Sequence, residues 1–221
     1  MRKPLRERLA LAGNLIYFSF VPLTLAGYVD IRPPIARSLD NIEAIVAVMR
    51  RLMLLRHAKT ERGEDDRNRK LTKRGRGDAS VIGAYMAQHG LVPDLAIVSP
   101  ARRAQETWKI LAAAFFGTPR DVNDERIYDA SPEALIAIIS ETRQAQSLLV
   151  VGHNPGLHDV AVQLIASGDP EARERVSENM PTSGLVVIDI AFDDWSLLRP
   201  NPNAGRLECF VTPRLIAAKA N

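Results

Sequence analysis

Short apolar stretches that alternate with helical ones constrain the fold of this chain more than any other feature. The apolar stretches are short enough to be buried strands and cover residues 52–55, 94–98 and 147–151. Between and after them, apolar residues recur at helical spacing over residues 72–89, 101–116 and 157–166. This alternation of strand and helix predicts a three-layer α/β/α sandwich with a mostly parallel sheet.

Capping residues locate two helix starts and one helix end. Thr72 is predicted to cap the N-terminus of the 72–89 helix, and Gly90 is predicted to end it. Ser131, Pro132 and Glu133 combine an N-cap, a proline at the first helical position and an acid in the first turn. Another helix is therefore expected to begin there.

The last part of the chain predicts strands of a different kind. Residues 184–190 and 195–198 flank Asp193 and Asp194, a pattern that is typical of a hairpin. A hairpin would give the sheet an antiparallel edge. Residues 207–211 predict a last strand.

The first residues of the chain differ from the rest. Residues 1–8 are basic, and residues 9–29 contain no charged side chain. Three interpretations stay open: a cleaved signal peptide, an amphipathic or membrane-anchoring segment, and an extension upstream of a natural start at Met49. We expect residues 1–48 to be an apolar, poorly ordered and dispensable extension, and residues 49–221 to form the domain.

Composition limits the choice of partner and compartment. The chain has 221 residues and a formal net charge of only +3 at pH 7, which argues against nucleic acid as a partner. Its one cysteine, Cys209, cannot form an internal disulfide, and this fits a reducing compartment. We expect a cytoplasmic protein, with membrane contact through residues 9–29 as the alternative.

Basic and imidazole side chains follow each of the three predicted strands. Arg56 and His57 end the first, Arg102 and Arg103 come shortly after the second, and His153 follows the third. Because ligands of open α/β sheets bind at the carboxyl ends of the strands, these side chains are expected to converge on one patch. Each pattern alone is ordinary on a protein surface, but three at strand ends indicate a site.

The residue types at this patch suit a phosphoryl group. Guanidinium groups bind phosphate oxygens in bidentate fashion, helix N-termini offer free N–H groups, and a neutral imidazole can attack phosphorus. The sequence has no Walker loop, no GxSxG motif and no paired carboxylates for a metal ion. We therefore expect chemistry without a metal or another cofactor. His89 and His158 are interpreted as structural.

Three motifs resemble the signatures of a known family. LLRHAKT (residues 54–60) resembles the first signature of the histidine phosphatase superfamily, which has the phosphoglycerate-mutase-like fold. IVSPARRAQET (97–107) resembles its second signature, and VVGHNPG (150–156) resembles the segment that carries its second histidine. The chain departs from the pattern at Ala58, where glycine is usual, and in the order of Gln105 and Glu106.

Further details resemble the short bacterial phosphohistidine phosphatases of the SixA type. These are the RHAK variant of the first motif, YDASPE (128–133), MPTSG (180–184) and the length after Met49. The resemblance covers roughly residues 52–212. It implies a phosphatase that removes phosphate from phosphohistidine in a signalling protein, such as a histidine-phosphotransfer domain. A phosphatase of small phosphorylated metabolites and a non-catalytic phosphate-binding module stay open as alternatives.

The resemblance also implies roles for individual residues. His57 would be the nucleophile, and Arg56, Arg103 and His153 would bind the phosphoryl group, with Asn154 as a further ligand. Many relatives use an acidic residue to protonate the leaving group. By position this residue would be Asp129, with Glu125 as second choice, although SixA-type members are thought to manage without a dedicated acid.

Overall fold

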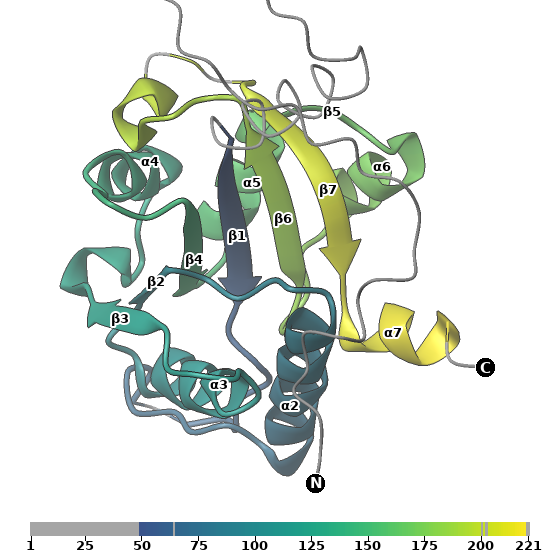
Figure 1. Cartoon of the computed structure of the whole chain (residues 1–221). Helices are drawn as coiled ribbons and strands as arrows, with labels where there is room; N and C mark the ends of the chain where they lie inside the picture. Colours follow the sequence, from purple (N-terminus) through teal and green to yellow (C-terminus); the bar gives the residue numbers. More distant parts are fainter. Residues whose placement is uncertain (1–48, 64, 200, 202, 220–221) are drawn as a thin grey trace, which may run out of the picture. The chain divides into compact units, whose positions relative to one another are not determined.

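The computed structural model describes residues 49–63, 65–199, 201 and 203–219. Seven strands form one sheet in the order β3-β2-β4-β1-β6-β7-β5 (Figure 1). The strands are β1 (Arg50–Arg56), β2 (Leu95–Val98), β3 (Arg120–Asn123), β4 (Ser147–Gly152), β5 (Ile165–Gly168), β6 (Leu185–Ile190) and β7 (Gly205–Val211). β3, β2, β4 and β1 are mutually parallel, and β6 is antiparallel to both β1 and β7. The predicted mixed sheet is confirmed.

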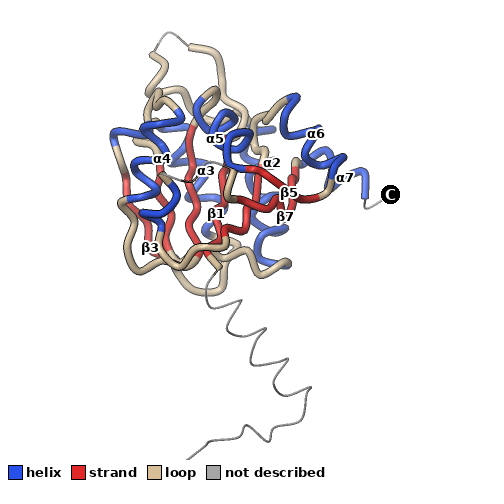
Figure 2. Tube along the Cα trace, turned by 90° about the horizontal axis from the view of Figure 1, so that it is seen from above, coloured by secondary structure: helices blue, strands red, loops and turns tan. Residues whose placement is uncertain are grey.

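Helices cover both faces of the sheet (Figure 2). They are α2 (Lys73–Gln88), α3 (Arg102–Ala112), α4 (Pro132–Ser140), α5 (Gly156–Leu164), α6 (Pro170–Glu178) and α7 (Pro213–Lys219). Leu52 and Leu54 of β1 pack in the core that α4, α5 and α6 close, whereas Met53 and Leu55 pack in the core that α2 and α3 close. Because successive strand residues point to opposite faces, a strand that is apolar throughout requires this double cover. The structure therefore has three layers.

The capping residues act as predicted. The hydroxyl of Thr72 accepts a hydrogen bond from the amide of Gly75 at 2.9 Å, and that of Ser131 accepts from Ala134 at 3.3 Å. Gly90 lies just beyond α2 with φ +65°, a conformation that favours glycine. The α3 helix ends at Ala112, a few residues earlier than predicted.

The predicted strand at residues 195–198 is wrong. Trp195–Leu198 form a short 3-10 helix, and the partner of β6 in the antiparallel pair is β7. Asp194 caps this helix by accepting a hydrogen bond from the amide of Ser196 at 2.8 Å. Trp195 and Leu198 are both buried, and a separation of three residues places two side chains on one side of a 3-10 helix. The spacing therefore reflected a helical turn and not a strand.

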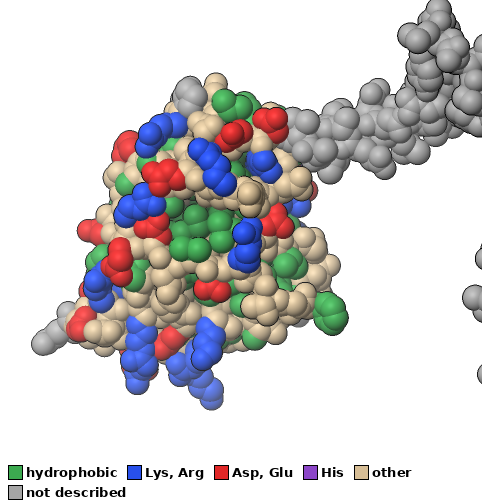
Figure 3. All heavy atoms as spheres, turned by 60° about the vertical axis from the view of Figure 1, so that its left-hand side comes forward, with side chains coloured by type: hydrophobic (Ala, Val, Ile, Leu, Met, Phe, Trp, Pro, Cys, Tyr) green, Lys and Arg blue, Asp and Glu red, His purple; other side chains and the backbone are tan. Residues whose placement is uncertain are grey.

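The prediction for residues 1–48 lies outside the described residues. Within the described part of the chain, no helix is long and apolar enough to cross a membrane. On the face shown in Figure 3, basic and acidic side chains are interspersed around a group of hydrophobic ones.

Candidate active site

The predicted site residues meet because their strands are adjacent and parallel. Arg56 at the end of β1 lies opposite Gly152 at the end of β4. The amide of His57 donates to the carbonyl of Gly152 at 3.1 Å, and the amide of Ser99, after β2, donates to that of Val151 at 2.9 Å. Three strand ends are thus tied together at one edge of the sheet, which is the lower edge in Figure 1.

His57 presents an unprotonated ring nitrogen. Its side chain is 9% exposed, and its Nδ1 lies 2.8 Å from the carbonyl oxygen of Ala58. Because a carbonyl only accepts hydrogen bonds, Nδ1 carries the proton and Nε2 keeps its lone pair. Burial, and then the guanidinium groups of Arg103, Arg56 and Arg69, lower the pKa of His57 to about 4. The imidazole is therefore neutral at physiological pH.

His153 has the opposite tautomer. Its Nδ1 accepts a hydrogen bond from Nε of Arg103 at 3.3 Å, and its Nε2 lies 2.7 Å from the hydroxyl of Ser99. Since Nδ1 accepts, the neutral ring carries its proton on Nε2 and donates it to Ser99. Burial, followed by the positive charge of Arg103 and, in acid, that of protonated His57, lowers the pKa of His153 to about 3. Protein groups thus engage both of its nitrogens.

The carbonyl of Met180 positions two of the predicted phosphate ligands. Nη1 of Arg56 and Nδ2 of Asn154 each donate to it at 2.9 Å. The Nε of Arg56 is buried and has no hydrogen-bond partner among the described residues. Burial also lowers the pKa of Arg56. A buried guanidinium N–H without a partner, one residue from His57, is a donor suited to an anion.

Arg103 lies in the first turn of α3 and is 5% exposed. Its backbone carbonyl accepts a hydrogen bond at 2.6 Å from the hydroxyl of Thr107, which itself accepts one at 3.0 Å from the amide of Ala58. This connection fixes Arg103 relative to the loop that follows β1. The methyl group of Ala58 packs in a small cluster with Leu71 and Ala79, and its φ is not positive, so glycine is not needed there.

Sequence reasoning missed four residues of this site. They are Ser99, which holds His153, and a group consisting of Asp66, Arg69 and Tyr128. Ser99 belongs to the motif at residues 97–107, in which only the arginines carry a charge that indicates phosphate binding. Asp66 and Arg69 lie in a stretch rich in charge, where no periodicity distinguishes a buried contact from a solvated one. Only the fold brings that stretch to the strand ends.

Asp129, the acid predicted by position, does not interact directly with the other predicted residues. It is exposed, has φ +54° and makes no hydrogen bond or ion pair with Arg56, His57, Arg103 or His153. Glu125, the second choice for an acid, forms an exposed ion pair with Arg67. The two structural histidines lie elsewhere: the ring of His89 stacks on Tyr85, and Nε2 of His158 donates to a carbonyl of α6.

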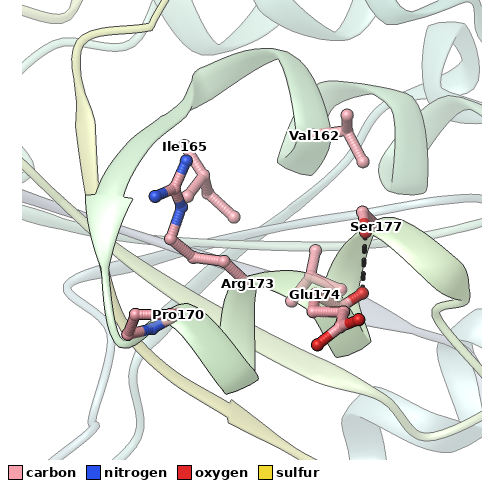
Figure 4. A pocket seen from close by; sticks show the side chains of 7 residues that line it. Val162, Ile165, Pro170, Arg173, Glu174 and Ser177 are labelled. Atoms are coloured by element: carbon pink, nitrogen blue, oxygen red, sulfur yellow. Dashed lines mark hydrogen bonds between the residues drawn. The ribbon is translucent and has the colours of Figure 1, made fainter.

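A cavity of about 330 Å³ between α5 and α6 contains none of the predicted site residues. Figure 4 shows its lining side chains, among them Arg173 and Glu174. Within the described part of the chain, no three His, Cys, Asp or Glu side chains gather closely enough to hold a metal ion.

Comparisons with known proteins agree with this geometry. Residues 52–126 match the family model of the histidine phosphatase superfamily, branch 1. An uncharacterized protein of Mycobacterium tuberculosis is 34% identical over 165 residues, which are 72% of this chain and 100% of the relative.

Two solved structures that both carry the name SixA are also similar. The structure from Agrobacterium tumefaciens is 30% identical with a TM-score of 0.63, and the match covers 74% of this chain and 98% of that one. The structure from Nakamurella multipartitia has a TM-score of 0.65 at 22% identity, covers 75% of this chain and 96% of that one, and shows the same fold. From its strand-end histidines and arginines and from relatives matched over their whole length, we conclude that the chain belongs to the histidine phosphatase superfamily and is a phosphatase.

Proposed function

We propose that the protein hydrolyses phosphohistidine in a signalling protein through a phosphorylated His57. The observation that carries this proposal is the state of the His57 ring. Its Nδ1–H is held by the carbonyl of Ala58 at 2.8 Å, so that Nε2 has a free lone pair. Three guanidinium groups, those of Arg103, Arg56 and Arg69, lie near enough to affect its pKa. A neutral nucleophile among fixed positive charges suits attack on a phosphoryl dianion.

The reaction would proceed in two displacements at phosphorus. Nε2 of His57 forms a bond to phosphorus while the bond to the leaving nitrogen breaks, and the leaving imidazole takes up a proton from solvent. Water then attacks the phosphorus of phospho-His57, loses a proton to solvent and releases inorganic phosphate with neutral His57. Arg56 and Arg103 would stabilise the charge on the equatorial oxygens in both steps.

The environment of the leaving group favours phosphohistidine as substrate. Asp129, the acid expected by position, is exposed and forms no hydrogen bond or ion pair with Arg56, His57, Arg103 or His153. Ester hydrolysis needs a donor for an alkoxide, whereas an imidazole leaves readily once solvent has protonated it. The one carboxylate in contact with Arg103 among the described residues, that of Asp66, has a pKa lowered to about 2 and carries no proton to donate, so the site suits a P–N bond better than a P–O bond. The 30% identity with a protein named SixA over 98% of its length supports the same substrate class.

A small phosphorylated metabolite is the second candidate, and one observation favours it. A cavity of about 480 Å³ is lined by Lys59, two residues beyond His57, and by Arg74 and Arg214. These three cations could hold a second anionic group of a small substrate. Asp78 also lines this cavity and forms an ion pair with Arg74 at 3.6 Å. Its carboxylate reduces the net positive charge of the cavity. We therefore rank the metabolite second.

A substrate panel tests the proposal. Purified protein is assayed with a phosphorylated histidine-phosphotransfer domain, with several sugar phosphates and with an aryl phosphate. We expect kcat/KM to be highest for the phosphorylated domain, while the aryl phosphate reports catalytic competence independently of recognition. A higher kcat/KM for one sugar phosphate would favour the metabolite, and no hydrolysis of any substrate would contradict the proposal as a whole.

A further inference from the structure

The Asp66 carboxylate lies among donors that would suit a phosphoryl group. Its Oδ2 accepts from Nη2 of Arg103 at 2.9 Å and from the hydroxyl of Tyr128 at 2.7 Å. Its Oδ1 is paired with Arg69, and its backbone carbonyl accepts from Nη1 of Arg103. Two guanidinium groups and a phenol thus converge on one anion. These contacts, with that of Tyr128 as the largest cause, lower the pKa of Asp66 to about 2.

The same donors belong to the surroundings of the nucleophile. The Nε of Arg103 donates to His153, whose ring centroid is 5.1 Å from that of His57. The rings of Tyr128 and His153 form a T-shaped pair with their centroids 5.6 Å apart. A phosphoryl group on its way to His57 would therefore meet donors that Asp66 already occupies. Two anions cannot share them, because like charges at contact distance repel each other strongly.

The position of Asp66 allows it to leave. Its side chain is 48% exposed, so the carboxylate can move into water without crossing a packed layer. The stretch that carries it is closed at its base by an antiparallel bridge between Thr60 and Leu71 and by a hydrogen bond from the amide of Glu61 to the carbonyl of Lys70. A movement of Asp66 therefore need not disturb the strand end that carries His57.

We propose that Arg69 and Tyr128 are phosphoryl-binding residues, together with Arg103, and that Asp66 is an internal competitor that occupies them until substrate displaces it. This inference rests on the proposed function, because it assigns further ligands and a built-in competitor to the same site. Displacement of Asp66 costs part of the binding free energy of every phosphoryl ligand. The protein thereby discriminates against weakly bound anions, since only a ligand with more contacts than the carboxylate gains from the exchange.

Binding of inorganic phosphate tests this inference without requiring turnover. Isothermal titration of the full chain in a phosphate-free buffer gives Kd for the wild type and for Asp66→Asn, which keeps the shape and the backbone contact but removes the charge. We expect Kd to fall by about 3- to 10-fold, the range for charge-assisted contacts of a half-exposed carboxylate. Asp65→Asn makes the same charge change one residue away, at an exposed side chain that accepts from the backbone and side-chain nitrogens of Asn68. That control should leave Kd within about twofold, because salt screens an exposed charge that is not in contact.

A double-mutant cycle tests the role of Tyr128. In the wild type, the Tyr128 hydroxyl donates to Asp66 before phosphate binds and would donate to phosphate afterwards. Tyr128→Phe removes one hydrogen bond from each state, so Kd for phosphate should change little. In the Asp66→Asn background no carboxylate compensates, and the same substitution should weaken phosphate binding by about 3- to 10-fold.

The outcomes separate this inference from the proposed function. An unchanged or weaker phosphate affinity in Asp66→Asn would show that Asp66 only positions Arg103. Together with retained phosphatase activity, this result would overturn the inference but not the proposed function. Equal effects of Tyr128→Phe in both backgrounds would remove Tyr128 from the phosphoryl site. Absence of turnover in the wild type, with phosphate binding still sensitive to Asp66, would instead contradict the proposed function.

Discussion

The rings of His57 and His153 lie with their centroids 5.1 Å apart, tilted by 54°, and carry their protons on opposite nitrogens. His57 donates from Nδ1 to the backbone, whereas His153 donates from Nε2 to Ser99. The first ring is thereby left with a free Nε2, while protein groups hold the second at both nitrogens. This difference in partners leaves Nε2 of His57 open to a ligand, whereas both ring nitrogens of His153 are engaged by the protein.

Replacement of His57 by alanine should abolish turnover. We expect the acid-labile phosphoenzyme to disappear as well, because no other described ring nitrogen at the site is free of a protein partner. Rapid-quench labelling with radioactive substrate measures both. His89→Ala, at the end of α2, serves as the control and should leave both unchanged. Phosphate mapped to His153 in trapped enzyme would contradict this assignment.

Replacement of Arg56 or Arg103 by lysine should reduce kcat/KM strongly. Lysine keeps the charge but loses the planar fork, and the loss should be about 2–4 kcal/mol of transition-state stabilisation, as for removal of an oxyanion donor. Steady-state kinetics with an aryl phosphate measures it. Arg102→Lys is a matched control, since Arg102 adjoins Arg103 but is exposed and paired with Glu106 at 2.7 Å. Wild-type rates in Arg103→Lys would remove that residue from the site.

Removal of the Ser99 hydroxyl should release the ring of His153. In Ser99→Ala, the buried Nε2–H of His153 loses its 2.7 Å partner, which costs about 1–3 kcal/mol and removes the preference for one tautomer. We expect kcat to fall on the order of tenfold with a smaller change in KM. Ser140→Ala controls for loss of a buried hydroxyl, because the Ser140 hydroxyl has no partner among the described residues. Equal kcat in the two variants would refute the positioning role of Ser99.

Replacement of two glycines in the first half of α2 by alanine should change the free energy of unfolding in opposite directions. A Cβ at Gly75 would lie 2.1 Å from the carbonyl oxygen of Lys59, so that the helix would have to move away from the loop after His57. Gly75→Ala should lower the free energy of unfolding by about 1–3 kcal/mol. A Cβ at Gly77 meets nothing within 4 Å, and Gly77→Ala should raise it by about 0.5–1 kcal/mol. Urea denaturation measures both, and a stable Gly75→Ala variant would contradict the close approach.

The stability of the protein should fall in mild acid because of its buried neutral imidazoles. The pKa of His153 is lowered from 6.5 to about 3 and that of His57 to about 4, so the unfolded state binds more protons than the folded state below pH 6.5. Each ring then lowers the free energy of unfolding by up to about 1.4 kcal/mol per pH unit as the pH falls from 6.5 towards 4. His153→Gln removes one of them, and its free energy of unfolding should decline less steeply over that window. Parallel curves for the wild type and the variant would disprove the linkage.

The layered α/β arrangement and the meeting of Arg56, His57 and His153 could be predicted from the sequence alone. Apolar runs such as Leu52–Leu55 are buried on both faces, and such runs in alternation with helices permit few arrangements besides a doubly covered sheet. Because β1 and β4 are parallel neighbours, Arg56, His57 and His153 all lie at the carboxyl ends of these strands. Local chemistry also set the helix starts at Thr72 and Ser131, because a cap needs only a side chain and an amide two or three residues away.

The tautomers of His57 and His153 and the contacts among Asp66, Arg69 and Tyr128 depend on the folded chain. Which nitrogen of His57 or His153 carries a proton depends on partners from other elements, and no pattern along the chain encodes them. The contact between Asp66 and Tyr128 joins the segment after β1 to the segment after β3, which are far apart in the sequence. Before the chain folds, the charges of Asp66 and Arg69 resemble those of any solvated segment. The short-range spacing of Trp195 and Leu198 likewise fitted a strand or a turn of helix. Burial of both residues in one core selected the helix, because long-range packing outweighs a weak local preference.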